Sequence, residues 1–211
     1  MPTHRTSAIR LTTFLHAACV VLTFASASVR IVVHAQTAAP QVSLELDPSR
    51  SKINWKLSAT AHTVHGTFGL TKGRIAFDPA GGKAGGEIIA DARSGESGDS
   101  GRDKNMHEKV LESAKYPMMT FSPDRVDGKV TLQGDSKVQI HGTLDIHGVK
   151  HELTVPADVN FAGDRWTAKS TFDIPYVQWG MKDPSNFILR VGATVSVELD
   201  LSGRVNPPHA S

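Results

Sequence analysis

The last long apolar segment of the chain alternates between apolar and polar residues, and this alternation constrains the fold more than any other feature. From Val191 to Leu201 every second residue is valine, alanine or leucine, and polar residues from Thr194 to Asp200 lie between them. Successive side chains of a β-strand point to opposite faces of the sheet, so this segment has one apolar face and one polar face. The pattern predicts a strand with one face buried and the other in water.

The same two-residue period recurs along most of the chain. Between Ile53 and Leu57, for example, apolar residues alternate with Asn54 and Lys56. Two predicted strands, His62–Leu70 and Gly73–Asp78, are separated by Thr71-Lys72, which we interpret as a tight turn. Further strands are predicted at His62–Leu70, Gly73–Asp78, Gly86–Gly95, Met118–Val126, Val138–Ile146, Val149–Phe161 and Arg165–Ile174.

Eight or nine sequential antiparallel strands, each apolar on one face, must either close into a barrel or stack as two sheets. Closure removes exposed edges, and about eight strands leave an interior that is packed with side chains or holds one small ligand. Glycines within the strand patterns, such as Gly66 and Gly142, suit the bends that a barrel needs. We therefore predict an all-β fold with a single antiparallel eight-stranded β-barrel. The pattern alone leaves a β-sandwich as the alternative.

One short helical segment interrupts the strands. It begins at Ser100–Asp103, a sequence similar to a capping box, so Ser100 is the predicted N-cap. Met106 and Leu111 then fall on one side of the helix, and Tyr116-Pro117 ends it.

The tetrapeptide Gly98-Asp99-Ser100-Gly101 matches the sequence around the nucleophile of trypsin-like proteases. In that class the sequence after the serine supports an oxyanion hole, but here Arg102 follows the single glycine. Nothing in the sequence links His62 or His65 to a buried acid. Because a serine at this place is explained by helix capping, we predict no catalytic residue.

The first 35 residues have the organisation of an export signal. Arg5 and Arg10 form a basic start, and Leu11–Phe24 is mostly apolar. Small-residue cleavage sites follow at Ala25-Ser26-Ala27 and Val33-His34-Ala35, of which we favour the second. The protein is therefore expected in the periplasm or outside the cell.

Cleavage after Ala35 gives the expected domain organisation. An uncleaved anchor and lipidation at Cys19 are the alternatives, although Arg30 interrupts the apolar run before the ~20 residues that span a bilayer. The expected parts are a signal peptide (1–35), a flexible N-terminal segment (36–43), the barrel domain (44–205) and a disordered tail (206–211).

Loss of the first 35 residues changes the charge argument. The whole chain has a formal net charge of +2, but the segment carries three arginines and no acid, which leaves 20 basic against 21 acidic residues. This balance gives no reason to expect a nucleic-acid partner. The one cysteine, Cys19, also lies in this segment, so the remainder has no disulfide, thiolate nucleophile or cysteine-based metal site.

Histidines are the candidate metal ligands. His62 with His65, and His147 with His151, have spacings that would pair two ligands on a helix, but both pairs lie in strand patterns. Alternation places His141 and His147 in solvent and lets His151 point inward. We favour surface or hydrogen-bonded imidazoles and no metal site. A metal-dependent enzyme that uses these histidines is the alternative.

The candidate ligand-binding residues are mostly aromatic and aliphatic side chains at predicted strand positions, together with Met106 on the helix and Trp179 in a loop. Ordinary core packing is the alternative for any one of them, and the functional interpretation is that some line an unfilled interior. The predicted ligand-binding set is Ile53, Trp55, Leu57, Phe68, Ile75, Phe77, Met106, Phe121, Leu144, His151, Leu153, Phe172, Trp179, Phe187, Val195 and Val197.

Four segments together resemble the YceI family, lipocalin-like proteins associated with polyisoprenoid binding. The most specific features are Arg102-Asp103, then Tyr116-Pro-x-x-x-Phe121, then Gly142-x-Leu-x-Ile-His-Gly148, in this order. The resemblance extends from about Leu44 to Val205. The four segments are Val64–Leu70, Ser100–Phe121, Gly142–Pro156 and Val191–Gly203.

The resemblance implies a lipocalin-like barrel that is closed near one end by the helix, which Arg102 and Asp103 would seat. An apolar channel would take an isoprenoid or quinone-like lipid, with no cofactor apart from that lipid. The implied partners are membrane electron-transfer proteins such as b-type cytochromes, and a homodimer is a further expectation. The chain differs from the family pattern at Arg50 and within Met106–Leu111, near the expected channel mouth. A fatty acid, a fatty amide, or a filled barrel that binds nothing are therefore the alternatives.

Overall fold

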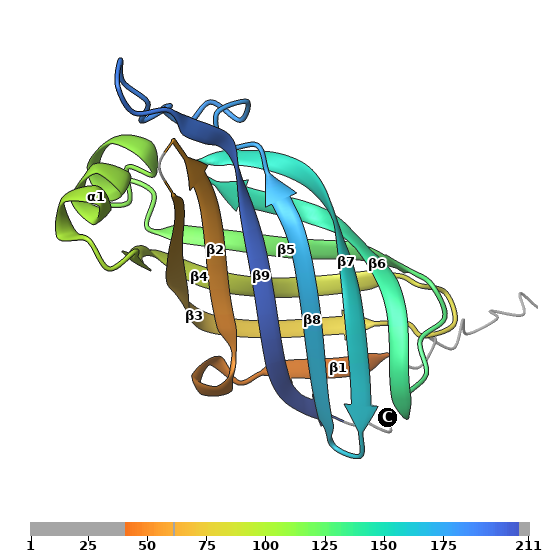
Figure 1. The fold of residues 1–211 in the computed structure, drawn as a ribbon. Coiled ribbons are helices and arrows are strands. Elements are labelled where there is room, and N and C mark those ends of the chain that lie inside the picture. Colours follow the sequence, from red (N-terminus) through yellow and green to blue (C-terminus); the bar gives the residue numbers. More distant parts are fainter. Residues whose placement is uncertain (1–40, 61, 207–211) are drawn as a thin grey trace, which may run out of the picture. The chain divides into compact units, whose positions relative to one another are not determined.

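Nine β-strands and two short helical segments follow one another in a computed structural model that describes residues 41–60 and 62–206 (Figure 1). The predicted signal peptide (1–35), residues 36–40 and residues 207–211 lie outside the described residues. The strands are β1 (Val42–Leu46), β2 (Lys52–Ala59), β3 (Thr63–Phe77), β4 (Ala84–Glu96), β5 (Met118–Asp127), β6 (Gly134–Ile146), β7 (Val149–Ala162), β8 (Arg165–Ile174) and β9 (Val191–Asn206).

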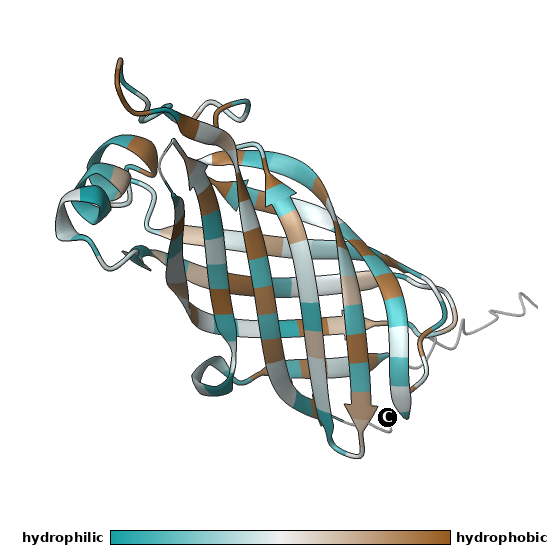
Figure 2. Ribbon diagram, viewed as in Figure 1, coloured by the Kyte–Doolittle hydropathy of each residue, from teal (hydrophilic) through white to brown (hydrophobic). Residues whose placement is uncertain are grey.

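The sheet closes on itself. From β2 to β9 each strand pairs antiparallel with the next one in sequence, and β9 pairs back onto β2. A closed sheet has no edge between its members, so the predicted eight-stranded antiparallel barrel is confirmed and the β-sandwich is excluded. In Figure 2, apolar and polar residues alternate along the strands, as the two-residue period requires.

One position in the barrel wall is shared by β1 and β2. Both strands lie between β3 and β9, but β1 pairs with the last part of β3 (Val42 with Phe77) and β2 with the first part (Ile53 with Phe68). A 3₁₀ turn at Pro48–Arg50 joins them, and the Asp47 carboxylate caps it by accepting from the Ser49 backbone N–H at 3.1 Å. β2 and β1 together therefore form the eighth strand of the barrel wall, and β1 extends it to the far end of the barrel.

The predicted turn at Thr71-Lys72 is wrong. β3 runs without interruption through this point, and its pairing with β4 shifts register between Leu70 and Lys72. Such a shift inserts an extra residue that bends and twists a strand without reversing it. Turn-like residues in this sequence therefore mark a bend in one long strand.

The predicted helix is present as α1 (Ser100–Asn105), continued by one π-helical turn, η2 (Met106–Val110). Its N-cap is Asp99 and not Ser100, because Asp99 has the extended backbone of a cap and its carboxylate accepts from the Arg102 N–H at 2.8 Å. That backbone hydrogen bond lowers the pKa of the Asp99 carboxyl. The helix thus begins with an aspartate cap, and Ser100 is its first residue.

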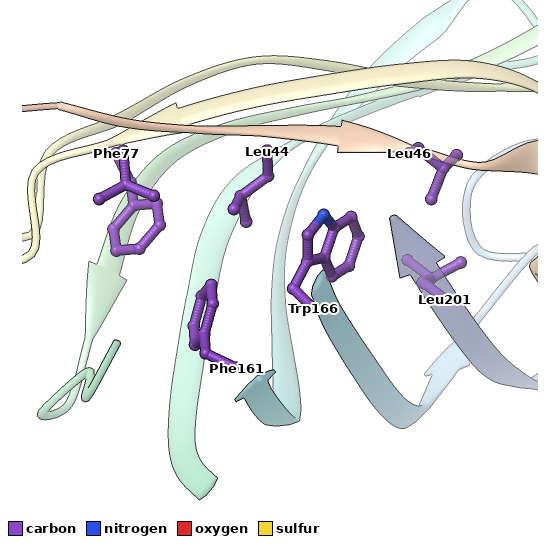
Figure 3. Close-up of a cluster of buried hydrophobic side chains, with 7 residues drawn as sticks. Leu44, Leu46, Phe77, Phe161, Trp166 and Leu201 are labelled. Atoms are coloured by element: carbon purple, nitrogen blue, oxygen red, sulfur yellow. The ribbon is translucent and has the colours of Figure 1, made fainter. Parts of the chain in front are cut away.

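The end of the barrel away from the helix is filled with side chains. Figure 3 shows them pointing toward one another across the interior, with the rings of Phe77 and Phe161 at 6.4 Å between centroids. Burial of so much apolar and aromatic surface makes this end the main packed core of the domain. The cluster, called here the packed end, consists of Val42, Leu44, Leu46, Phe77, Phe161, Trp166 and Leu201.

Close contact between β1 and β9 at the packed end depends on Gly203. A Cβ atom at this position would lie 1.9 Å from the Glu45 carbonyl oxygen and 2.8 Å from Trp166 Nε1. We predict that Gly203→Ala lowers the free energy of unfolding by about 1–3 kcal/mol, because the backbone must move to admit the methyl group. Urea denaturation measures the difference.

The matched control is Gly85→Ala, since a Cβ atom at Gly85 on β4 would have no atom within 4 Å. An equal change in both variants would contradict the close packing of β1 on β9.

Candidate functional site: an apolar cavity in the barrel

A cavity of about 510 Å³ occupies the barrel between the packed end and the helix. Every strand from β2 to β9 contributes to its lining, and Met106, Val110 and Leu111 contribute from the helical segment. Nearly all of the lining side chains are aliphatic or aromatic. The few polar ones include Asp99, Arg102, Asn105 and His62 at the end where the helix lies. The interior is therefore suited to an apolar ligand, and the helix end is its mouth.

Most of the predicted ligand-binding residues border this cavity. They come from β2, β3, β5, β6, β7, β8, β9 and the helix, and the closed sheet brings their inner faces together. Contact with a ligand stays a prediction for all of them. The lining includes Ile53, Trp55, Leu57, Phe68, Met106, Phe121, Leu144, Leu153, Phe172, Val195 and Val197.

The other five predicted residues do not line the cavity. Phe77 belongs to the packed end, and Ile75 packs against it. His151 stacks on Trp179, with ring centroids 4.1 Å apart and planes 3° from parallel. Phe187 is 97% exposed in the loop before β9. Alternation identifies the inner face of a strand, but the level along the barrel depends on strand register, which the sequence pattern does not give.

Small residues lining the middle of the barrel were not predicted. Along the inner face of β8 the large Trp166 is followed by Ala168 and Ser170, and only then by Phe172. On β7, Ala157 lines the same region. Side chains of this size cannot fill the interior, so the cavity begins at the level of these small residues, next to the packed end. Small residues at inward positions of a strand are the signal that could have located it.

Trp55 lies against the barrel wall because its neighbour on β3 is a glycine. Trp55 pairs with Gly66, and the indole ring occupies the space where a side chain at position 66 would project, with Cζ2 only 2.2 Å from an ideal Cβ. The indole is 5% exposed, and its ring centroid lies 6.4 Å from that of Phe68. The missing side chain at Gly66 therefore leaves space for the Trp55 indole, the largest side chain that lines the cavity, to lie against the wall and not across the channel.

Hydrogen bonds attach the start of the helix to the end of β4. Asp103 accepts from the backbone N–H of Ser97 at 2.9 Å and also from its hydroxyl group. Arg102 donates from Nε to Ser97 Oγ at 2.7 Å and from Nη2 to the Ser97 carbonyl oxygen at 3.0 Å. Both residues therefore hold the helix at the cavity mouth, the role that the resemblance implied for them.

Residues 44–203 match the YceI-like domain family. The chain belongs to this family. Among curated relatives, the UPF0312 protein of Vibrio vulnificus strain YJ016 is 26% identical over 161 residues, covering 74% of this chain and 82% of that protein. The UPF0312 protein of Pseudomonas putida strain F1 is 26% identical over 173 residues, covering 77% and 88%.

Two solved structures have the same fold as this YceI-like barrel. A polyisoprenoid-binding domain from Saccharophagus degradans superposes with a TM-score of 0.63 at 20% identity, covering 77% of this chain and 98% of that one. Burkholderia cenocepacia BcnA superposes with a TM-score of 0.61 at 20% identity, covering 74% and 98%. At this level of identity the similarity establishes the architecture.

Two histidines of the YceI-like barrel fasten the helical segment. His107 lies with Nδ1 2.9 Å from Ser113 Oγ and Nε2 2.8 Å from the Gly95 carbonyl oxygen. Because a carbonyl oxygen only accepts, Nε2 donates to Gly95, and in the neutral ring Nδ1 accepts from the serine hydroxyl. His147, at the turn between β6 and β7, lies with Nε2 2.7 Å from a Glu112 carboxylate oxygen. The predicted exposure of His147 is wrong, since the end of the helical segment covers it and leaves 17% of its side chain exposed.

The other described histidines include His141. His141 lies on the outer face, as predicted, within 2.8 Å of both Asp127 Oδ2 and Thr154 Oγ1. In the part of the chain that the structure describes, no three His, Cys, Asp or Glu side chains are grouped to hold a metal ion. None of the described helices has the length and apolarity to cross a membrane.

Tyr176 at the cavity mouth offers a spectroscopic test of the burial of the site. Its hydroxyl donates to the Gly192 carbonyl oxygen at 2.8 Å, and burial, followed by the nearby Asp183 charge, raises its pKa to about 12. The chain has two tyrosines, so Tyr176 is the only one in a Tyr116→Phe variant. We predict that tyrosinate absorbance of the native variant rises at a pH of about 12, and near 10 in denaturant.

The folded-state pKa is higher than the unfolded one, so the contribution of the neutral phenol to stability is complete below pH ~10. It is lost as the pH rises through the folded-state value of about 12. Native titration near 10 would contradict the buried position of Tyr176.

The helix attachment can be tested with Asp103→Ala. This change leaves both Ser97 donors without their acceptor, so we predict that the opening free energy of residues 100–111 falls by about 1–3 kcal/mol. Hydrogen exchange with mass spectrometry measures it. The control is Glu108→Ala on the same helical segment, whose contact with Lys104 is long (4.0 Å) and exposed. Equal exchange in both variants would contradict the role of Asp103.

Proposed function

We propose that this protein is an exported carrier or reservoir that holds a long apolar lipid in the barrel cavity, with an isoprenoid or quinone-like lipid as the preferred ligand. The observation that carries the proposal is the apolar cavity between the packed end and the helix. The shared fold with a polyisoprenoid-binding domain supports the ligand class. The basic and apolar pattern of residues 1–35 supports export to the periplasm or beyond.

The cavity lining indicates how such a lipid is oriented. Burial of apolar surface gives about 25 cal/mol per Å², so a long chain gains affinity in this interior without a polar partner. Polar side chains border the cavity at the mouth, where Asp99, Arg102 and Asn105 lie on or beside the helix start. An amphipathic lipid therefore binds with its tail inward and its polar group at the mouth.

The dimensions favour a single extended chain. Along β9 the lining extends from Val191 to Leu201, roughly 33 Å along a strand and, with the usual tilt of barrel strands, roughly 25 Å in depth. This depth suits an extended prenyl or acyl tail, and a quinone ring on such a tail would lie near the polar side chains of the mouth.

The apolar lining gives no reason to propose catalysis. Ser100 lies at the helix start, and His62 is the histidine that borders the cavity, at its mouth. A carrier needs no reacting group, whereas a histidine-based metal enzyme needs several ligands directed at one point. For a quinone-like ligand, b-type cytochromes and related membrane electron-transfer proteins are the partners that the family resemblance suggests, and a homodimer is a further expectation.

Lipid that co-purifies with the protein tests the proposal. We predict that native mass spectrometry and solvent extraction recover a long-chain apolar lipid from the wild type. Val195→Trp should reduce the recovered lipid at least about 10-fold, because the indole enters the cavity that Val195 lines. Its thermal stability should change little, whereas the same change in a packed core would cost about 1–3 kcal/mol.

The control is Thr194→Trp, which adds the same ring at the next position, where the side chain is exposed. Equal lipid in both variants, or none in the wild type, would overturn the carrier function.

A further inference from the structure

The loop before β9 presents large apolar side chains to solvent beside the cavity mouth. Phe187 is 97% exposed, Ile188 86% and Leu189 39%. Leu189 and Pro184 also line the cavity, so the exposed apolar surface is continuous with the apolar interior. In Figure 1 this loop projects beyond the end of the barrel near α1, and Figure 2 colours its tip as hydrophobic.

Hydrogen bonds fix the loop in the conformation that exposes its tip. The Asn186 side chain accepts from the N–H groups of Ile188 (2.9 Å) and Leu189 (2.8 Å), and the Asn186 N–H donates to the Leu189 carbonyl oxygen (2.9 Å). The base of the loop is fastened to Thr60, whose N–H donates to the Arg190 carbonyl oxygen at 2.9 Å and whose hydroxyl accepts from the Arg190 N–H at 2.8 Å. The turn therefore fixes Phe187 and Ile188 outward.

We propose that Phe187, Ile188 and Leu189 form a membrane-docking tip that inserts into the interfacial region of a lipid bilayer and places the cavity mouth at its surface. The inference rests on the proposed function for its purpose, since a long apolar chain must pass between bilayer and cavity without crossing water. Lys182, Asp183 and Arg190 flank the tip and are exposed, so the flank has a net charge of +1 and can pair with lipid phosphates.

The size of the tip favours a bilayer over a protein partner. Three side chains can cover at most roughly 500 Å², less than the ~800 Å² that each partner of a stable protein interface buries. Insertion of a few apolar side chains with flanking cations is sufficient for reversible binding to a membrane surface. Continuity with the cavity lining also has a use at a bilayer, where it gives the lipid tail an apolar path.

Vesicle co-sedimentation of the purified protein tests the docking tip. The probes are vesicles of phosphatidylethanolamine with phosphatidylglycerol, and vesicles of phosphatidylcholine alone. Phe187→Ser with Ile188→Ser should weaken partitioning at least about 10-fold in both arms, with tighter wild-type binding to the anionic vesicles. The control is Leu132→Ser, since Leu132 is 46% exposed in the loop between β5 and β6, away from the mouth. Unchanged partitioning of the double variant would overturn the proposal.

A fluorophore gives a second readout that does not depend on other membrane-binding parts of the chain. In a Cys19→Ser background, an environment-sensitive dye is attached to Phe187→Cys or to Leu132→Cys. Addition of vesicles should shift the emission to the blue at position 187 and leave position 132 unchanged. No shift at position 187 would overturn docking through the tip.

Two further measurements separate docking from lipid carriage and from self-association. The double variant should still bind farnesol, followed by intrinsic tryptophan fluorescence, and Val195→Trp should still bind vesicles. If the wild type does not bind farnesol, the carrier function is contradicted but the docking proposal is not. If the double variant changes a dimer into a monomer and keeps vesicle binding, the tip is a contact between copies and the docking proposal fails.

Discussion

Hydrogen-bonded closure of the sheet is the constraint on which the rest of the structure depends. β9 pairs with β8 on one side and with β2 and β1 on the other, so the chain's last strand joins its first two. Closure satisfies the backbone of strands that would otherwise present open edges, and it directs all apolar faces to one interior. The packed end, the cavity and the mouth are three levels of that interior.

Unequal filling of this interior separates a core from a binding cavity. Trp166, Phe161 and Phe77 supply stability at one end, while Ala157 and Ala168 leave space in the middle. Protein interiors normally pack as densely as organic crystals, so a cavity of about 510 Å³ gives up contacts that a filled barrel would make. The packed end supplies apolar burial that offsets this loss, and the stable part of the fold is therefore distinct from the part that can accept a ligand.

Polar contacts at the mouth hold the helical segment to the barrel. Arg102 and Asp103 hold the helix start to Ser97, and Glu112 holds its end to His147. The loop with the exposed Phe187 also lies at the mouth, where its Leu189 lines the cavity. An entrance made of one fastened helix and one apolar loop suits the entry of a lipid from one side.

Much of the fold could be predicted from the sequence because strand alternation and helix capping are local. The period of two along Val191–Leu201 identified β9 and its inner face, and the order of the strands favoured closure. Local signals failed where the same short sequence suits two different kinds of local structure. Thr71-Lys72 suits a hairpin turn or a bulge, and Asp99 and Ser100 both suit a cap, so only the paired strands and the backbone geometry distinguished them.

By itself, the sequence determined which side chains face the barrel interior, because that property repeats every two residues along each strand. Only the tertiary structure decided at which level each of them lies, since level depends on register between strands distant in sequence. Phe77 and Phe172 both face inward, yet pairing places Phe77 in the packed end and Phe172 against the cavity. Phe187, which was expected at a strand position, lies exposed in the loop before β9, and only the folded structure showed this because the ends of a strand depend on its pairing partners.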